Sequence, residues 1–338
     1  MRRKRSLAFI LCLSMFLMLI GCGTKNEQEV IELLSDRIKE LSSYESYGKM
    51  VVRTGQEPVV YDVEVWYKKP HFYRVSLKNQ KKKITQILLR NNQGVFVVTP
   101  HLKKSFRFQS DWPNRGGQVY LYQTIMNNIV QDSKRLFEPG EDAYQFEVSA
   151  QYAAQSMPTK QRIWLDRDLY PKKVHVFDQD QERMVEVQFD RFKENVSFDD
   201  DAFELKRNLA TSNLPDETRE TAGKQRPIQA VIPTYVPKGS QFQDEQVIET
   251  SNGPVSMLRF RGEKPFTLMI KRPSMIEAGL PVYGEPILLD QGVGVFLTMD
   301  QRKQISWVDG QREYDLVGEL PSEEMVKIAN SIFDQTSK

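Results

Sequence analysis

The stretch VVYDVEVWYKKPHFYRVSL, residues 59–77, decides the fold of this chain. Apolar and polar side chains alternate over residues 59–67, and a period of two is typical of a β-strand with one buried face. Lys69-Pro70-His71 follows as a turn, because proline fixes φ and has no backbone donor. Residues 72–77 resume the β pattern, so the stretch predicts an antiparallel hairpin.

The hairpin predicts a longer meander, because similar runs flank it on both sides. The pattern already has strand character from residue 46, and short turns divide the part up to residue 109. Such short connections exclude helical crossovers, so neighbouring strands are expected to run antiparallel. The further strands are expected at 84–90, 94–99, 105–109, 144–150, 161–166, 172–177 and 184–190.

Two amphipathic segments predict helices beside the meander. In residues 25–43 the apolar side chains, among them Val30 and Leu34, return at helical spacing, and Asn26 can cap the first turn. Residues 118–135 show the same spacing. The elements together predict a mainly β fold of the α+β class.

A polar stretch divides the chain. Residues 206–227 have no apolar periodicity and contain Pro215, Gly223 and Pro227. We expect a larger domain over 22–206, a linker over 207–227 and a smaller α+β domain over 228–338. The smaller domain is expected to have a closing helix capped by Ser322 and strands at 255–260, 266–271, 286–289, 293–299 and 304–308.

The first residues read as a lipoprotein signal peptide over 1–21. A basic Arg2-Arg3-Lys4-Arg5 precedes an apolar run over 7–20, and Leu19-Ile20-Gly21-Cys22 looks like a lipobox. The alternative is an ordinary signal peptide that ends near a cysteine. We expect Cys22 to carry lipid and to hold the mature chain on the extracytoplasmic face of the cell membrane.

Composition narrows the classes of partner. The chain has 47 basic and 45 acidic residues, and the leader holds four of the basic ones, so a near-neutral mature protein does not suit nucleic acid. Its two cysteines are Cys12, inside the leader, and Cys22, so no thiol remains for catalysis or a disulfide. The lysine runs at 81–83 and 103–104 are typical of solvated hairpin tips or protected strand edges, and contact with anionic lipid headgroups is the alternative.

No catalytic motif stands out, neither G-x-S-x-G nor H-E-x-x-H nor a glycine-rich phosphate loop. The histidines, His71, His101 and His175, are scattered, which favours structural roles over a metal site. The Asp178/Asp180 pair and the run Asp199-Asp200-Asp201 fit turns better than cation sites or catalytic carboxylates. We therefore expect no enzyme activity, no cofactor and no metal.

The apolar strand faces are the remaining candidate site. Their side chains could line a ligand cavity or fill an ordinary core, and both readings stay open at this point. The cavity-lining candidates are Val63, Val65, Phe72, Leu77, Leu89, Phe96, Val98, Phe106 and Phe108.

Residues 27–206 resemble the LolA-like lipoprotein-carrier superfamily, and the whole chain resembles sporulation lipoproteins of endospore-forming bacteria. The resemblance rests on the strand–Lys-Pro–strand stretch at 65–74, the hairpin at 87–100, the strand and turn at 163–171 and the closing segment at 189–205. It implies an unclosed antiparallel β-barrel covered by helices, with an apolar cavity that holds acyl chains in carriers. Two departures are the lipid tether and Val95-Phe96 in place of the tryptophan usual after the hairpin glycine.

Two functional hypotheses follow. The first is a membrane-anchored, non-enzymatic lipoprotein of sporulation or germination, whose barrel binds an acyl chain, a lipoprotein or a partner protein. The second is an envelope regulatory module of the RseB type, which the order of the two domains resembles. It would act on a transmembrane partner through residues 228–338.

Overall fold

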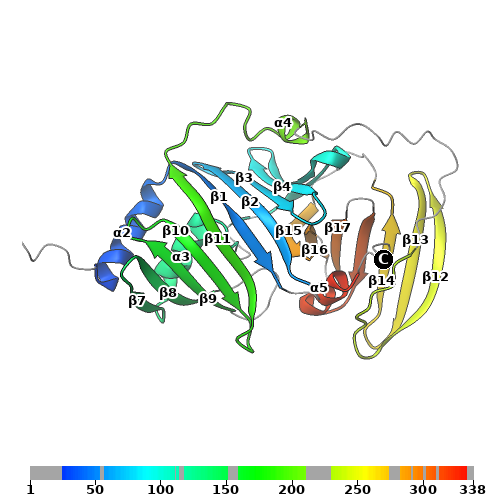
Figure 1. The fold of residues 1–338 in the computed structure, drawn as a ribbon. Helices are drawn as coiled ribbons and strands as arrows, with labels where there is room; N and C mark the ends of the chain where they lie inside the picture. The colour runs from blue at the N-terminus through cyan, green and yellow to red at the C-terminus, as the bar shows by residue number, and fades with distance from the viewer. Residues whose placement is uncertain are drawn as a thin grey trace, which may run out of the picture.

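The computed structural model describes residues 25–53, 57–110, 112–113, 118–150, 159–210, 230–273, 282–290, 292–299, 302–309 and 312–332. Its 18 strands join edge to edge in one ribbon, which forms a curled part and a second, flatter part (Figure 1). The predicted signal peptide, Cys22 and residues 211–227 of the predicted linker lie outside the described residues.

The curled part is an unclosed antiparallel sheet, which we call the half-barrel. Its spatial order is β7-β8-β9-β10-β11-β1-β2-β3-β4-β5-β6, and no described pairing joins β6 to β7. The geometry confirms the architecture that the LolA-like resemblance implied. The strands are β1 (Ser43–Val52), β2 (Val59–Lys68), β3 (Phe72–Asn79), β4 (Thr85–Asn91), β5 (Gly94–Thr99), β6 (Lys104–Gln109), β7 (Leu136–Pro139), β8 (Ala143–Ala150), β9 (Thr159–Asp166), β10 (Pro171–Phe177) and β11 (Arg183–Glu194).

Two helices, α2 (Glu27–Glu40) and α3 (Tyr122–Gln131), cover one face of the half-barrel, which we call the inner face. In Figure 1, α3 lies behind the strands. The predicted cap is confirmed as a capping box, because Asn26 Oδ1 accepts from the Glu29 backbone N–H and Glu29 Oε2 accepts from that of Asn26, each at 3.0 Å. Both helices are shorter than expected, and β1 begins at Ser43, where the first helix was expected to end.

The flatter part, the second sheet, has the order β15-β16-β17-β18-β14-β13-β12. Helix α5 (Ser322–Asn330) packs on its core, but Pro321 is the N-cap and no side chain caps the helix, so the prediction that Ser322 caps it is wrong. The predictions missed β12 and β18. The strands are β12 (Ser240–Thr250), β13 (Gly253–Gly262), β14 (Phe266–Lys271), β15 (Val282–Leu289), β16 (Gly292–Met299), β17 (Arg302–Val308) and β18 (Glu313–Gly318).

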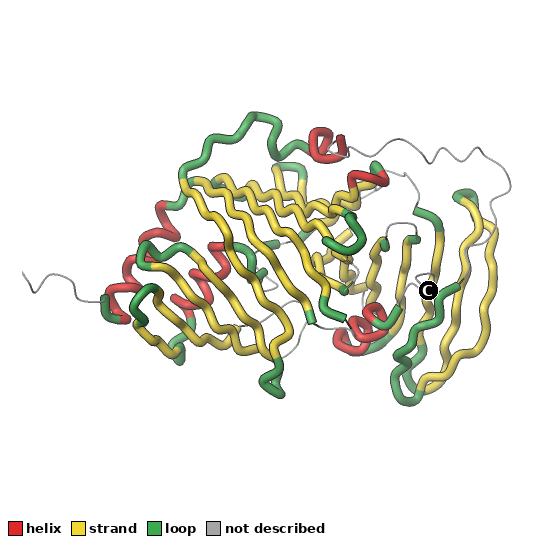
Figure 2. The backbone as a smooth tube through the Cα atoms, in the orientation of Figure 1, coloured by secondary structure: helices red, strands yellow, loops and turns green. Residues whose placement is uncertain are grey.

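The outer face of the half-barrel has a cover of its own. Residues 195–204 cross it without regular structure and continue into the short helix α4 (Leu205–Ala210), seen at the top of Figure 2. The first four residues of the predicted linker, 207–210, belong to α4.

Leu34 provides a test of the helix packing, because its side chain is fully buried while Leu33 beside it is 43% exposed. Leu34→Ala should lower the free energy of unfolding by about 2–5 kcal/mol, since it leaves a cavity under α2. Leu33→Ala is the matched control and should change it by less than about 0.5 kcal/mol. Chemical denaturation measures both values, and equal effects would contradict the packing described.

Candidate functional site

The inner face contains five of the nine predicted cavity-lining residues. Val63, Val65, Leu77 and Phe108 are at most 5% exposed there, and Phe106 packs against them while partly buried. They belong to β2, β3 and β6, in which inward residues alternate with outward ones. The pattern in the sequence was sufficient to place these side chains.

The other four candidates lie on the outer face, so the prediction that all nine line one cavity is corrected. Leu89, Phe96 and Val98 are buried there, and Phe72 packs against their cluster. The physical reason is that β4 and β5 are apolar on both faces, so hydrophobicity does not reveal which residues point inward. On these strands the inner face is formed by Leu88, Val95 and Val97.

Helix side chains fill the inner face. Val30 and Leu34 of α2 and Ile125, Met126 and Ile129 of α3 are at most 1% exposed and pack against the strands.

Two tyrosine hydroxyls in this core donate hydrogen bonds to groups of the chain itself. The hydroxyl of Tyr44 donates to Gln123 Oε1 at 2.9 Å, and that of Tyr122 donates to the Leu169 carbonyl at 2.8 Å. Burial raises the pKa of both tyrosines well above its usual value, so both stay neutral donors.

A buried arginine ties the cover to the outer face. Arg74 Nε donates to Asn208 Oδ1 of α4 at 2.7 Å, and Arg74 Nη1 donates to Glu64 Oε2 at 2.6 Å. The guanidinium also lies 4.3 Å from the ring centre of Trp66. Phe203 of the cover packs in the apolar cluster beneath. The outer face is therefore also closed by side chains of the chain itself.

The half-barrel and the second sheet meet at a joint. Strand β15 pairs in parallel with β6 through Val282 and Tyr283 and then pairs with β16. Gln86 of β4 binds the backbone of Val293 in both directions, accepting from its N–H at 2.7 Å and donating to its carbonyl at 3.2 Å. Gly292 is required beside it, because a Cβ there would lie 2.1 Å from Gln86 Oε1. The joint is thus held by backbone and side-chain hydrogen bonds.

A group of buried charges lies at the joint. Lys104 of β6 pairs with Glu313 of β18, and their side chains are only 10% and 12% exposed. Lys271 Nζ lies 3.5 Å from Glu313 Oε1 and 2.7 Å from Asp315 Oδ2, and these carboxylates hold the pKa of Lys271 above its usual value although burial opposes them. Lys104 is therefore not available to lipid headgroups. Lys81 is exposed and pairs with Glu57.

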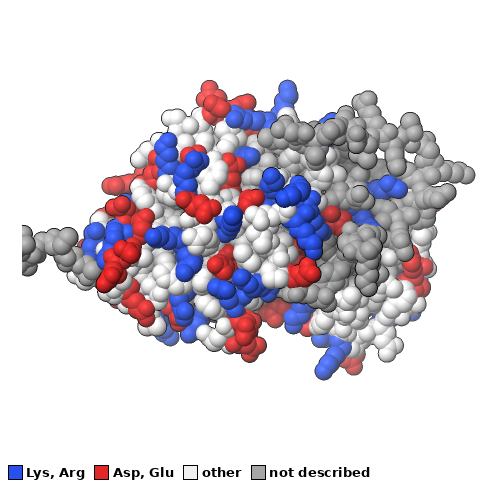
Figure 3. Space-filling view, viewed as in Figure 1, with Lys and Arg blue, Asp and Glu red and all other residues white. Residues whose placement is uncertain are grey.

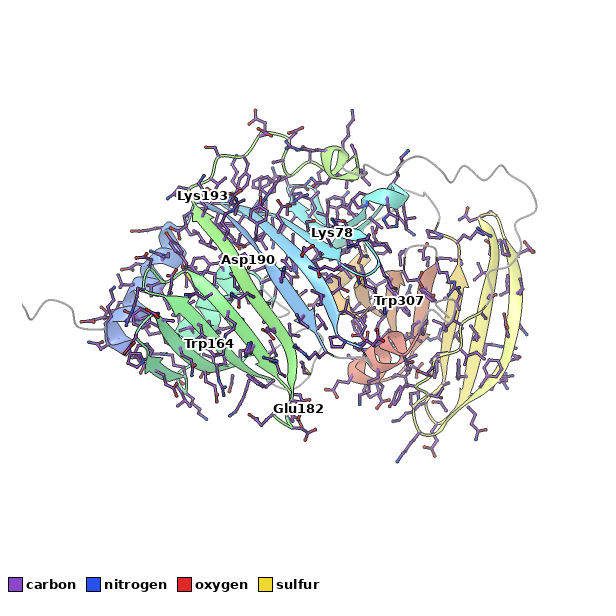
Figure 4. The ribbon with its side chains drawn as sticks, in the orientation of Figure 1. Lys78, Trp164, Glu182, Asp190, Lys193 and Trp307 are labelled. Carbon is purple, nitrogen blue, oxygen red and sulfur yellow. The ribbon has the colours of Figure 1, made fainter. Side chains whose placement is uncertain are left out.

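The cavity at this joint is small. It has a volume of about 30 Å³ and is lined by residues of both sheets, including Phe106, Val295 and Trp307. Trp307 is labelled in Figure 4. A volume of this size accommodates a few water molecules at most and no acyl chain.

Several polar groups considered for catalysis or metal binding have structural contacts. Within the described ranges, no three His, Cys, Asp or Glu side chains come together as a metal site. His175 packs against Trp164 and Phe177, and burial lowers its pKa to about 4. Asp178 Oδ1 accepts turn N–H groups at 2.9 and 3.0 Å, as a turn residue does. Figure 3 shows basic and acidic side chains interspersed over the half-barrel.

Strand β12 is an exposed surface element that the sequence predictions missed. It has 11 residues, and nearly all its side chains face solvent, so neither period-two burial nor apolar clustering indicates it. The available signal was its position between Gly239 and Gly253, both of which have positive φ.

Glu313 provides a test of the joint, because it faces both Lys104 and Lys271. Glu313→Gln should lower the free energy of unfolding by about 3–5 kcal/mol, since it leaves Lys104 buried without a counter-charge. Lys104→Met should cost less, because Glu313 keeps Lys271. The exposed pair of Lys81 supplies the control, and Lys81→Met should cost at most about 1 kcal/mol. Denaturation curves that show equal losses of unfolding free energy for Lys81→Met and Glu313→Gln would refute this account.

In the described part of the chain, no helix has the length and apolarity needed to span a membrane.

A family model described as "Sporulation protein YdcC-like" matches residues 3–203. Sporulation protein YdcC of Bacillus subtilis (strain 168) is 37% identical over 340 residues, 99% of each chain. A chain of the Pseudomonas aeruginosa MucA/MucB complex is similar over 92% of this chain and 100% of its own, at 15% identity and a TM-score of 0.32. The LolA superfamily protein NE2245 of Nitrosomonas europaea is similar over 53% and 98%, at 12% identity and 0.29. By the family model and the identity to its relative, the chain belongs to the sporulation protein YdcC-like family.

Proposed function

We propose that this chain is a non-enzymatic, membrane-anchored lipoprotein of sporulation or germination that works by binding a partner protein. The chain belongs to a sporulation family. Among the residues considered for chemistry, Asp178 lies in a turn, His175 packs against aromatic rings and Asp199 pairs with Arg207. A binding role needs none of them.

The filled inner face is the observation that carries the choice of a protein ligand. Burying an acyl chain contributes about 0.8 kcal/mol per CH₂, but only where apolar surface is free to receive it. Here Val65, Leu77 and Phe108 are at most 2% exposed, in a core that also contains side chains of α2, α3 and β16. A ligand that leaves this packing intact binds at the surface, as a protein does.

Cys22 supports the membrane location. The lipobox-like sequence ends at Cys22, and only residues 23–26 separate it from the start of α2. A lipid-modified cysteine with more than one acyl chain gives stable anchoring, whereas a single chain gives marginal binding. With so short a tether, the beginning of α2 would lie close to the extracytoplasmic face of the membrane.

The acyl-chain version of the first hypothesis requires a different conformation. Lipid could enter the inner face only if α2 and α3 moved away from the strands and exposed Leu34 and Met126. The second hypothesis, a regulatory module acting through residues 228–338, agrees with the proposal in that its ligand is a protein. The acyl-chain version and the protein-binding proposal therefore differ in what occupies the inner face, which is lipid in the first and the side chains of the chain itself in the second.

Cys22→Ala tests the anchor. In a sporulating strain, the unchanged protein should fractionate with membranes and incorporate labelled palmitate, whereas Cys22→Ala should lose both properties. Cys12→Ala is the matched control and should retain both, because Cys12 lies inside the predicted leader. A Cys22→Ala chain that still takes up palmitate would show that lipid is attached elsewhere.

Native mass spectrometry tests the occupant of the inner face. We expect residues 22–338 with Cys22→Ala, incubated with total lipid extract, to remain free of non-covalent lipid, because side chains of the chain itself fill the space. A stoichiometric acyl ligand that survives gentle desolvation would overturn the protein-ligand proposal and favour the carrier version.

A further inference from the structure

Strand β12 is the last strand of the second sheet, in which the described pairings run β15-β16-β17-β18-β14-β13-β12. It pairs with β13 on one side, and among the described residues no strand pairs with its other side. Figure 1 shows it at the opposite end of the molecule from α2, the helix that follows the predicted anchor. An edge of this kind presents unpaired backbone N–H and C=O groups to an incoming strand.

The strand is long and carries exposed apolar side chains. Phe242, Val247 and Ile248 are 46%, 47% and 41% exposed. A bulge between Phe242 and Asp244 interrupts the register near the start of β12, and the seven residues from Asp244 onward pair regularly with β13. Bulges protect edges where they occur, so the regular seven-residue part is the unprotected part.

The charge of the edge is acidic. β12 contains Asp244, Glu245 and Glu249 and no lysine or arginine. Arg259 of β13 neutralises Asp244, with Nε 2.7 Å from Oδ1. Because alternate residues of a strand share a face, Glu245, Val247 and Glu249 form an acid–apolar–acid row on one face of the edge.

We propose that β12 is a docking strand for an extended segment of a partner protein that presents basic, apolar and basic side chains in turn on one face, at every second residue. The backbone of the segment would add to the free edge of β12. Its lysines or arginines would pair with Glu245 and Glu249, and an apolar side chain would cover Val247. This inference deepens the proposed function, on which it rests, by naming the surface and the chemistry of the partner.

A second copy of the chain fits this edge poorly. Two β12 strands side by side would bring acidic residues close to one another, and like charges on facing strands are destabilising. The charge therefore selects a basic partner over self-association.

The test uses the full mature chain in detergent micelles and two nine-residue peptides with blocked ends. One peptide has lysine at positions 3 and 7, valine at position 5 and threonine elsewhere, so that lysine, valine and lysine share one face, and the other has glutamate in place of both lysines. Fluorescence anisotropy at low salt should show the lysine peptide binding about tenfold more tightly, since two charge pairs of opposite sign replace two of like sign.

Charge reversal at the edge supplies the decisive variant. Glu245→Lys with Glu249→Lys should reverse the preference between the two peptides, and Val247→Ser should weaken binding of both. The matched control is Glu182→Lys with Glu204→Lys, which makes the same change of net charge at exposed sites on the half-barrel (Glu182 is labelled in Figure 4) and should leave the preference unchanged. All four positions of charge reversal are exposed, so the variants should fold.

Hydrogen exchange shows where the peptide binds. The lysine peptide should slow exchange of amides within β12 and leave those of α2 and α3 unchanged. The inference is overturned if the Glu245 and Glu249 reversal leaves the peptide preference unchanged, or if protection falls outside β12. It is also overturned if β12 amides are already protected in the free chain by another segment or by a second copy. Lipid found inside the half-barrel would refute the proposed function without changing these peptide measurements, so the two failures are distinguishable.

Discussion

The need to cover the inner face of the half-barrel is the constraint on which the rest of the structure depends. An unclosed sheet of 11 strands presents a broad apolar face, and that face must be covered before the sheet is stable in water. Helices α2 and α3 provide the cover with side chains such as Leu34 and Ile125, each of which contributes about 1.5–3 kcal/mol when fully buried. Stability and an internal ligand site therefore compete for the same apolar surface. In this chain the core occupies it.

The joint determines how the second sheet continues from the first. The parallel pairing of β15 with β6 involves only two residue pairs, too few to fix an orientation alone. Gln86 adds two hydrogen bonds to Val293, and Lys104 adds a buried ion pair with Glu313, 209 residues further along the chain. Val293 and Val295 of β16 also enter the core of the half-barrel. The two sheets therefore share apolar contacts as well as polar ones.

Sequence patterns predicted those features of the fold that depend on local periodicity, such as strand faces and helix capping. The alternation in 59–67 correctly indicated which residues of β2 face inward, and the capping of α2 by Asn26 was correct in detail. The inward residues of β4 and β5 could not be identified, because both faces of these strands are buried under different covers. The pairing of Lys104 with Glu313 could not be predicted either, because it depends on how two sheets meet, which no local period records.

The two edge strands of the ribbon, β7 and β12, differ in how well they are protected against pairing with another strand. Strand β7 has only four residues and ends in Pro139, and its Phe137 stacks on Tyr144 of the neighbouring strand. Short edge strands and proline are common protections against unwanted pairing, so β7 offers little to an incoming strand. Strand β12 has 11 residues, no proline and acidic side chains around Val247. Its acids discourage pairing with another acidic strand but attract a basic one. The same charges therefore protect the edge from copies of the chain and make it selective for a basic partner.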